Sequence, residues 1–128
     1  MLGIQTKQDK KLNYYKEQLE QIKKDYSNSK LKVEHKVRLD EFIDRAINYC
    51  KTQKVIAYKS IGKNYTPSTP YNKIQKGVYK KVLADVKTLR QKILDDEDLK
   101  LKHKQELCRC LSYLIGHLMG RLQRKVGR

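Results

Sequence analysis

The sequence predicts an all-α fold, an antiparallel bundle of about four helices with one long basic loop, organised as a single domain over residues 1–128. Apolar residues recur at three- and four-residue spacing along most of the chain, and no segment shows the alternation of a strand. Turn-forming residues gather in two short segments and one long one, and short connections join antiparallel helices. A chain of 128 residues can bury one core but not two comfortable ones.

The first two helices are predicted from about Thr6 to Tyr26 and from about Lys32 to Ala57. Ser27, Asn28 and Ser29 end the first helix. Acids of the second helix lie only in its first half, so its charge changes sign midway. The expected core positions are Leu12, Tyr15, Leu19, Ile22 and Tyr26 in the first helix, and Val33, Val37, Leu39, Ile43, Ala46, Ile47 and Cys50 in the second.

The last two helices are predicted from about Asn72 to Leu94 and from about Leu99 to Val126. The acidic turn Asp95–Asp98 precedes the fourth helix, where negative charge stabilises a helix N-terminus. In the third helix Lys73, Lys76, Lys80 and Lys87 fall opposite the apolar stripe. The expected core positions are Ile74, Val78, Val82, Val86, Leu89 and Ile93, then Leu107, Leu111, Leu114, Leu118 and Leu122.

The charge distribution predicts a polyanion partner. The chain has 30 basic and 14 acidic residues, a net charge of +16, and the forty residues from Arg45 to Ala84 contain no acid. A solvated, lysine-rich face is the alternative, but ordinary solubilising surfaces intersperse both signs. Tyrosines among the lysines offer stacking surfaces for bases, which favours nucleic acid over a membrane. These tyrosines are Tyr58, Tyr65, Tyr71 and Tyr79.

Lysine predominates over arginine at the expected contact positions, which indicates sequence-independent binding to the backbone. Arginines near the C-terminus can bind two oxygens of one phosphate, or their charge can interact favourably with the dipole of their own helix. The residues expected to bind nucleic acid are Lys54, Tyr58, Lys59, Lys63, Tyr65, Tyr71, Lys73, Lys76, Lys80, Lys81, Arg121, Arg124 and Arg128.

Three small residues at four-residue spacing, Ser112, Gly116 and Gly120, form a strip on the fourth helix away from its leucine stripe. Such a strip lets another helix approach closely. The sequence leaves open whether that helix belongs to the same bundle or to a separate protomer, so the three residues are predicted to form a protein interface.

Catalytic and metal-binding sites are not expected, so the chain is interpreted as a binder that is not an enzyme and needs no cofactor. The segment Ala57–Asn64 lacks the first glycine and the hydroxyl of a phosphate-binding loop. Cys108 and Cys110 lie two apart on a helix, which does not suit zinc, and Asp95–Asp98 lacks the spaced ligands of a calcium loop.

The sequence also bears on the compartment. No apolar run approaches the ~20 residues that span a bilayer, so no membrane is expected. The first residues lack the order of a signal peptide, and the three cysteines cannot all pair within one chain. An intracellular, cytoplasmic setting is expected.

In size, helicity, positive charge and its closing helix, Leu111-Ser112-Tyr113-Leu114-Ile115-Gly116-His117-Leu118-Met119-Gly120-Arg121-Leu122, the chain resembles the small subunit of CRISPR effector complexes, which serve antiviral defence. The resemblance implies a helical bundle present in several copies, stacked head to tail beside other subunits, that stabilises a guide–target hybrid or the displaced DNA strand. RNA, single-stranded DNA or a hybrid would be the partner. The resemblance implies, on charge alone, that the basic residues binding the nucleic acid are Lys59, Lys63, Lys73, Lys76, Lys80, Arg121, Arg124 and Arg128.

Two other classes remain open. A stand-alone phage or plasmid protein that coats or bends duplex DNA would use similar lysine faces but is expected to dimerise with two-fold symmetry. A basic protein-interaction module, such as an inhibitor or adaptor, would instead place its positive face on an acidic protein.

Overall fold

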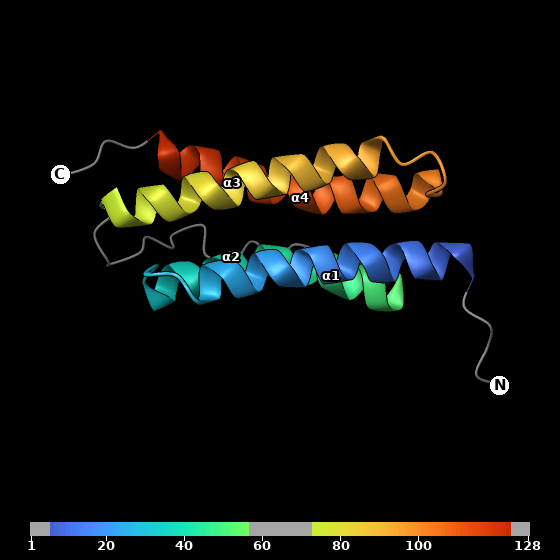
Figure 1. Cartoon of the computed structure of the whole chain (residues 1–128), viewed down its shortest axis with the longest axis horizontal. Helices are drawn as coiled ribbons and strands as arrows, with labels where there is room; N and C mark the ends of the chain where they lie inside the picture. Colours follow the sequence, from blue (N-terminus) through green and yellow to red (C-terminus); the bar gives the residue numbers. More distant parts are fainter. Residues whose placement is uncertain (1–5, 57–72, 124–128) are drawn as a thin grey trace.

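The computed structural model describes residues 6–56 and 73–123, and within them it contains four α-helices and no strand. The helices are α1 (Lys7–Ser27), α2 (Val33–Thr52), α3 (Lys73–Leu94) and α4 (Leu101–Leu122), coloured in sequence order in Figure 1. The prediction of an all-α, four-helix bundle is confirmed. Residues 57–72, which include the whole of the predicted basic loop from Ser60 to Asn72, lie outside the described part.

The helices form two layers, which are two antiparallel hairpins packed on each other. One layer is α1 with α2 and the other is α3 with α4; between the layers α2 contacts α4 and α1 contacts α3 (Figure 1). Every contacting pair runs antiparallel. The end of α2 lies at one end of the bundle and the start of α3 at the other, so the chain between them links the two ends of a bundle about 30 Å long.

Local signals set the start of α1 and the end of α2. Thr6 and Asp9 form a capping box at the start of α1, where Asp9 N donates to Thr6 Oγ1 at 3.0 Å and Thr6 N donates to Asp9 Oδ2 at 3.1 Å. The prediction that the second helix reaches Ala57 is wrong. It ends at Thr52, because Gln53 takes a left-handed conformation with φ 57° and its N–H closes the last turn on Tyr49 O at 2.7 Å.

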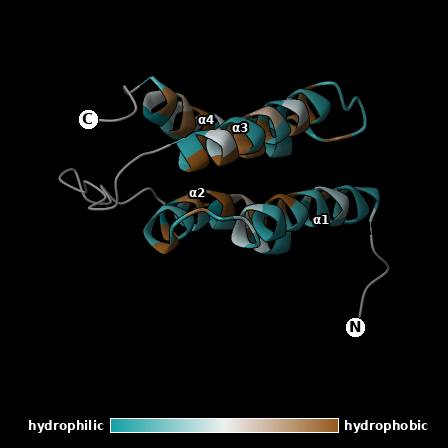
Figure 2. Cartoon of the chain, turned by 60° about the vertical axis from the view of Figure 1, so that its left-hand side comes forward, coloured by the Kyte–Doolittle hydropathy of each residue, from teal (hydrophilic) through white to brown (hydrophobic). Residues whose placement is uncertain are grey.

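The core lies between the two layers, and all four helices contribute to it. Each helix carries hydrophobic and hydrophilic surfaces, which Figure 2 shows as brown and teal. Every core position predicted for the first helix is buried, and Leu122 and Val78 are partly buried against the core. The other predicted positions that are buried are Leu39, Ile43, Ala46, Ile47, Cys50, Val82, Val86, Leu89, Ile93, Leu107, Leu111, Leu114 and Leu118.

Three predicted core positions are wrong, and all lie near the starts of α2 and α3. Val33, Val37 and Ile74 are 74%, 52% and 51% exposed. The polar residues His35, Gln75 and Tyr79 are buried in their place. His35 Nδ1 and the Tyr79 hydroxyl are hydrogen-bonded at 2.8 Å, so the pair satisfies part of its polarity inside the core and fixes the rotation of both helices.

Buried tyrosine hydroxyls connect the helices. Tyr26 donates to Asp40 within the first layer, and the Tyr49 hydroxyl is 2.8 Å from His103 Nδ1 between α2 and α4. Burial and the hydrogen bond to Asp40 raise the pKa of Tyr26 well above its ordinary value. Such directional links favour this pairing of helices over others, a role that buried polar groups serve in some helical assemblies.

Candidate nucleic-acid interface

Basic side chains gather on the outward side of the α3–α4 layer. These residues lie on the outward side of α3 and α4 or beside the groove between the two helices, and together they are called the α3–α4 basic face. Its members are Lys73, Lys76, Lys80, Lys87 and Arg90 of α3, with Lys102 and Arg109 of α4; Lys76 and Arg90 are half-buried and the others exposed.

The two acids within α3 and α4 leave most of this face uncompensated. Asp85 pairs with Lys81 at 3.2 Å on the side of α3 that faces α1. Glu106 lies close enough to Tyr49 of α2 to raise the pKa of that tyrosine, although burial is the larger cause. Its charge also helps to raise the pKa of Arg109, after the larger effect of Tyr113. The α3 part of the face therefore keeps its positive charge.

Helical periodicity brings three of its lysines into a row. Lys76, Lys80 and Lys87 are separated by four and seven residues, which places them on one side of α3 over about 16 Å. Among the described residues, none of the three forms an ion pair. Unpaired amino groups in a row suit a polyanion.

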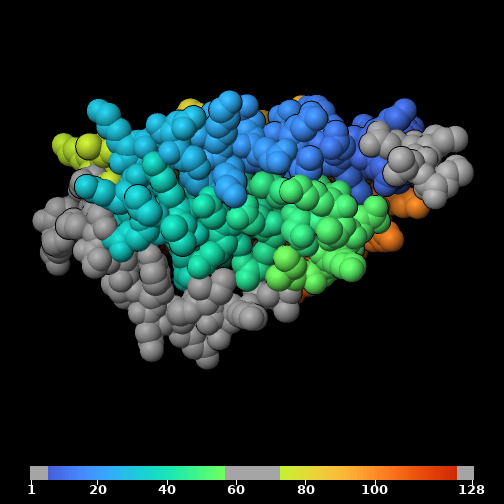
Figure 3. Space-filling view, turned by 90° about the horizontal axis from the view of Figure 1, so that it is seen from below, coloured from blue at the N-terminus to red at the C-terminus, as the bar shows by residue number. Residues whose placement is uncertain are grey.

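The α1–α2 layer, seen in Figure 3 as the face covered by blue α1 and teal-to-green α2, carries both signs. Lys23 pairs with Asp44 at 2.7 Å across the two helices, and Arg38 pairs with Glu41 at 3.0 Å within α2. Much of the positive charge of this layer is therefore compensated by acids of the same layer.

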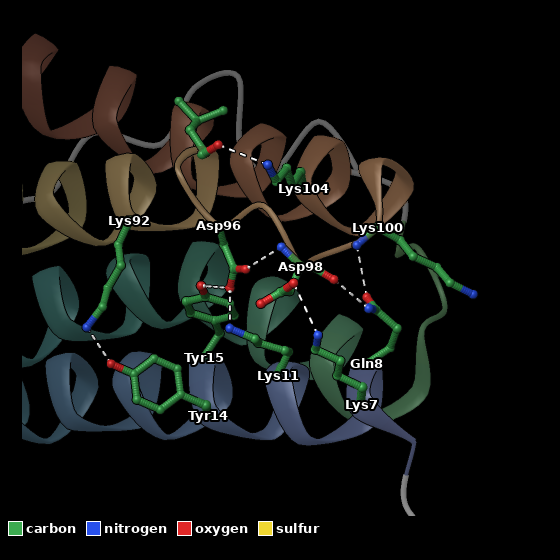
Figure 4. Close-up of polar contacts among 11 residues, drawn as sticks. Lys7, Gln8, Lys11, Tyr14, Tyr15, Lys92, Asp96, Asp98, Lys100 and Lys104 are labelled. Atoms are coloured by element: carbon green, nitrogen blue, oxygen red, sulfur yellow. Dashed lines mark hydrogen bonds and ion pairs between the residues drawn. The ribbon is translucent and has the colours of Figure 1, made fainter.

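The acidic turn between α3 and α4 is bound by the start of α1 (Figure 4). Asp96 accepts a hydrogen bond from the Tyr15 hydroxyl and forms an ion pair with Lys11 at 3.1 Å. Asp98 forms an ion pair with Lys7, also at 3.1 Å. Burial disfavours the charge of Asp96, but the bonds from Tyr15 and Lys11 outweigh it and lower its pKa. The turn thus links the two layers and compensates the positive charge of lysines in α1.

A surface groove runs between α3 and α4 within the basic face. Its lining residues are Lys87, Arg90, Gln91, Ser112 and Ile115, none of them acidic. Arg90 Nε donates a hydrogen bond to Ser112 Oγ at 3.0 Å. Sequence reasoning did not single out Arg90, although its position three residues after Lys87 places it on the adjoining side of the helix.

The structure brings only some of the predicted contact residues together. Lys73, Lys76 and Lys80 share the basic face, whereas Lys81 turns toward α1 and pairs with Asp25 and Asp85. Lys54 is exposed but follows the end of α2, at the opposite end of the bundle from the start of α3. The acid-free stretch of sequence is therefore not one continuous surface.

Two further predictions are corrected by burial. Tyr79 is fully buried and bonded to His35, so its ring is not a stacking surface for bases. Arg121 is 8% exposed and lies near enough to His35 to lower the pKa of that imidazole, after the larger effect of burial. The remaining predicted contact residues lie outside the described part of the chain: Tyr58, Lys59, Lys63, Tyr65, Tyr71, Arg124 and Arg128.

The strip Ser112, Gly116 and Gly120 faces outward. All three residues are exposed, and a Cβ atom added at Gly116 or Gly120 would meet nothing within 4 Å. Of the helices that the structure describes, α3 reaches only Ser112, through Arg90, so the interpretation that another helix of the same bundle packs along the whole strip is wrong for them. Contact with a separate protomer stays a prediction.

Residues 6–56 and 73–123 contain no cluster of three or more His, Cys, Asp or Glu side chains arranged to hold a metal ion. All three cysteines are buried, and burial raises the pKa of Cys50 to about 12. In the same residues no helix has the length and hydropathy needed to cross a membrane.

No model of a known protein family matches the chain, and searches of curated proteins and of solved structures found no match either.

Proposed function

We propose that this chain is a non-catalytic protein that binds nucleic acid largely independently of sequence, through phosphate contacts from the α3–α4 basic face. The observation that carries the proposal is the separation of charge: outward positions of α3 and α4 present basic side chains without acids, while acids elsewhere pair with lysines. Lysines bind phosphates as point charges and read no bases, so sequence preference is weak.

The resemblance to small subunits of CRISPR effector complexes supplies the setting of the proposal. In that setting the chain works in the cytoplasm beside other subunits and further copies of itself, on RNA, single-stranded DNA or their hybrid. Each copy then needs only modest affinity, because several copies aligned on one strand multiply it.

The test is binding of the purified chain to mixed-sequence single-stranded DNA, duplex DNA and RNA across a salt series, read by fluorescence anisotropy. The affinity is expected to fall steeply with salt, with a log–log slope of about −0.7 per phosphate contacted on a single strand and about −0.9 on duplex. Replacing Lys73, Lys76 and Lys80 by Glu is expected to weaken binding at least 100-fold at low salt, because each change removes one attraction and adds one repulsion (roughly 1 kcal/mol or more per site).

The matched control replaces three exposed lysines of the other layer, Lys10, Lys24 and Lys51, by Glu. Both triple variants change the net charge equally, so a loss confined to the first locates the interface on α3. Equal losses would refute that location. A flat salt response, or no binding to any of the three nucleic acids, would refute the proposal and favour an acidic protein partner.

A further inference from the structure

We infer that the groove between α3 and α4 is a phosphate-binding site in which Ser112 positions Arg90 for a bidentate contact. The inference rests on the proposed function and deepens it, because it assigns one built contact within the basic face. The groove is lined by Lys87, Arg90, Gln91, Ser112 and Ile115.

The geometry of Arg90 carries the argument. Its Nε donates to Ser112 Oγ at 3.0 Å, which holds the guanidinium plane and leaves the N–H donors of its two terminal amino groups for another acceptor. Arg90 O also accepts a weak hydrogen bond from Cys108 Sγ of α4 at 4.0 Å, a second contact between the two helices at this position. A planar guanidinium held in this way matches two oxygens of one phosphate.

Lys87 and Ser112 fit the same ligand. Lys87 is exposed beside Arg90, and the Ser112 hydroxyl keeps its hydrogen for donation because its oxygen accepts from Arg90. The Gln91 amide nitrogen donates to Asp95 at 3.0 Å, outside the groove. By contrast, the groove between α1 and α3 contains Asp25 and Asp85, which would repel an anion.

The fold explains why the site is rigid. Arg90 and Ser112 lie in the interiors of two long helices that pack against each other over the common core, so neither depends on a loop for its position. Arg90 is half-buried, and a charge at the edge of the protein interior interacts more strongly with an anion than a charge in free solvent. A phosphodiester group of a nucleic acid and inorganic phosphate share the required chemistry.

The experiment compares Arg90→Gln, Arg90→Lys, Ser112→Ala and Ser112→Thr with the wild type on a fluorescent single strand, with circular dichroism to verify folding. Arg90→Gln is expected to lower affinity about tenfold and to make the salt slope shallower by about 0.7, the loss of one phosphate. Arg90→Lys is expected to keep the slope but not the full affinity. Lys10→Gln, on the outer face of α1, is the control and is expected to change little.

Ser112 is a positioning residue, so its test looks for coupling. Ser112→Ala is expected to weaken binding about threefold, Ser112→Thr to restore it, and Ser112→Ala to cost nothing further in the Arg90→Gln background. Independent, additive losses would overturn the positioning role, because a merely structural serine would act regardless of Arg90.

A titration with inorganic phosphate, followed by NMR at Arg90 Nε–H and the Ser112 amide, separates this inference from the proposed function. Shifts at both groups without any binding of nucleic acid would support an anion site and refute the proposed function. An unchanged salt slope in Arg90→Gln, while the lysine-to-glutamate variant of α3 loses binding, would overturn the groove site and leave the proposed function standing. If phosphate shifts neither group and the chain binds no nucleic acid, both the groove site and the proposed function would be overturned.

Discussion

The two layers of the bundle have the same architecture but differ in how far their positive charge is compensated by acids. Each is an antiparallel pair of helices of similar length with one apolar side toward the shared core. In the α1–α2 layer, acids and bases alternate and form pairs such as Lys23–Asp44. In the α3–α4 layer, basic side chains occupy the outward positions without acids. The net charge of +16 is therefore compensated unevenly: acids pair with many bases of the first layer and with few on the outward side of the second.

The acids of the α3–α4 turn explain how that difference arises. By sequence, Asp95–Asp98 belong to the second hairpin and partly balance its charge. In the structure, Asp96 and Asp98 are bound by Lys11 and Lys7 of α1 at one end of the bundle (Figure 4). The turn therefore compensates the first layer and leaves the outward face of the second layer positive.

The largest effect on stability is expected at Asp96, through which this turn is bonded to α1. Asp96→Asn is expected to cost about 2 kcal/mol of unfolding free energy, because its carboxylate is 7% exposed and accepts from Tyr15, Lys11 and the Asp98 amide. Asp98→Asn is the matched control in the same turn. Its ion pair with Lys7 is exposed on both sides, so a loss below about 0.5 kcal/mol is expected.

Urea unfolding at neutral pH measures both variants, and the pH dependence gives an independent check. The lowered pKa of Asp96 adds stability that is present above its unfolded pKa and is lost as pH falls through the folded pKa, so the difference between wild type and Asp96→Asn is expected to shrink in acid. Equal losses in the two variants, or a difference that grows in acid, would contradict the assigned role of Asp96.

The buried histidines connect the two layers and predict a second pH dependence. His35 bonds to Tyr79 of α3, and His103 bonds to Tyr49 of α2. Burial is the main cause that lowers the pKa of both imidazoles, so the unfolded chain binds protons first as pH falls below about 6.5. Stability is expected to fall with decreasing pH from that point, by at most about 1.4 kcal/mol per pH unit for each histidine.

Thermal unfolding between pH 7 and pH 5 tests this expectation, with His35→Gln and His103→Gln separately and together. The double variant is expected to be less stable at pH 7, and its melting temperature to change less with pH than that of the wild type. A wild-type melting temperature that rises as pH is lowered over this range would contradict the assigned direction of the two histidine pKa shifts.

The smallest effect is expected on the outward strip of α4. Gly116→Ala and Gly120→Ala are each expected to raise stability by roughly 0.5–1 kcal/mol, since alanine favours a helix interior and the added Cβ meets nothing within 4 Å. Gly77→Ala on α3 is the control, because its surroundings are equally open. Destabilisation by the two α4 changes alone would show that a neighbouring chain packs on the strip, which sedimentation of each variant would detect.

The sequence allowed only part of the candidate site to be predicted. Lys73, Lys76 and Lys80 were identified because their spacing opposite an apolar stripe is a property of one helix. Lys81 was assigned to the contact surface and Arg90 was not singled out, since the partner of each lies on another helix: Asp25 of α1 for Lys81, and Ser112 of α4 for Arg90. Arg121 was expected to be exposed, but it is buried near His35 where α4 meets α2.

The sequence by itself determined the four helices and most of their buried sides, because helical periodicity and capping act over a few residues. Leu12, Leu19, Leu111 and Leu118 are inside as their spacing requires. Tertiary structure decided the exceptions: His35 and Tyr79 are buried where Val33 and Ile74 were expected, because each polar group finds its partner on a different helix. It also decided which lysines stay unpaired, since an ion pair depends on the distance between side chains that the helices bring together, and pattern along one helix does not contain that distance.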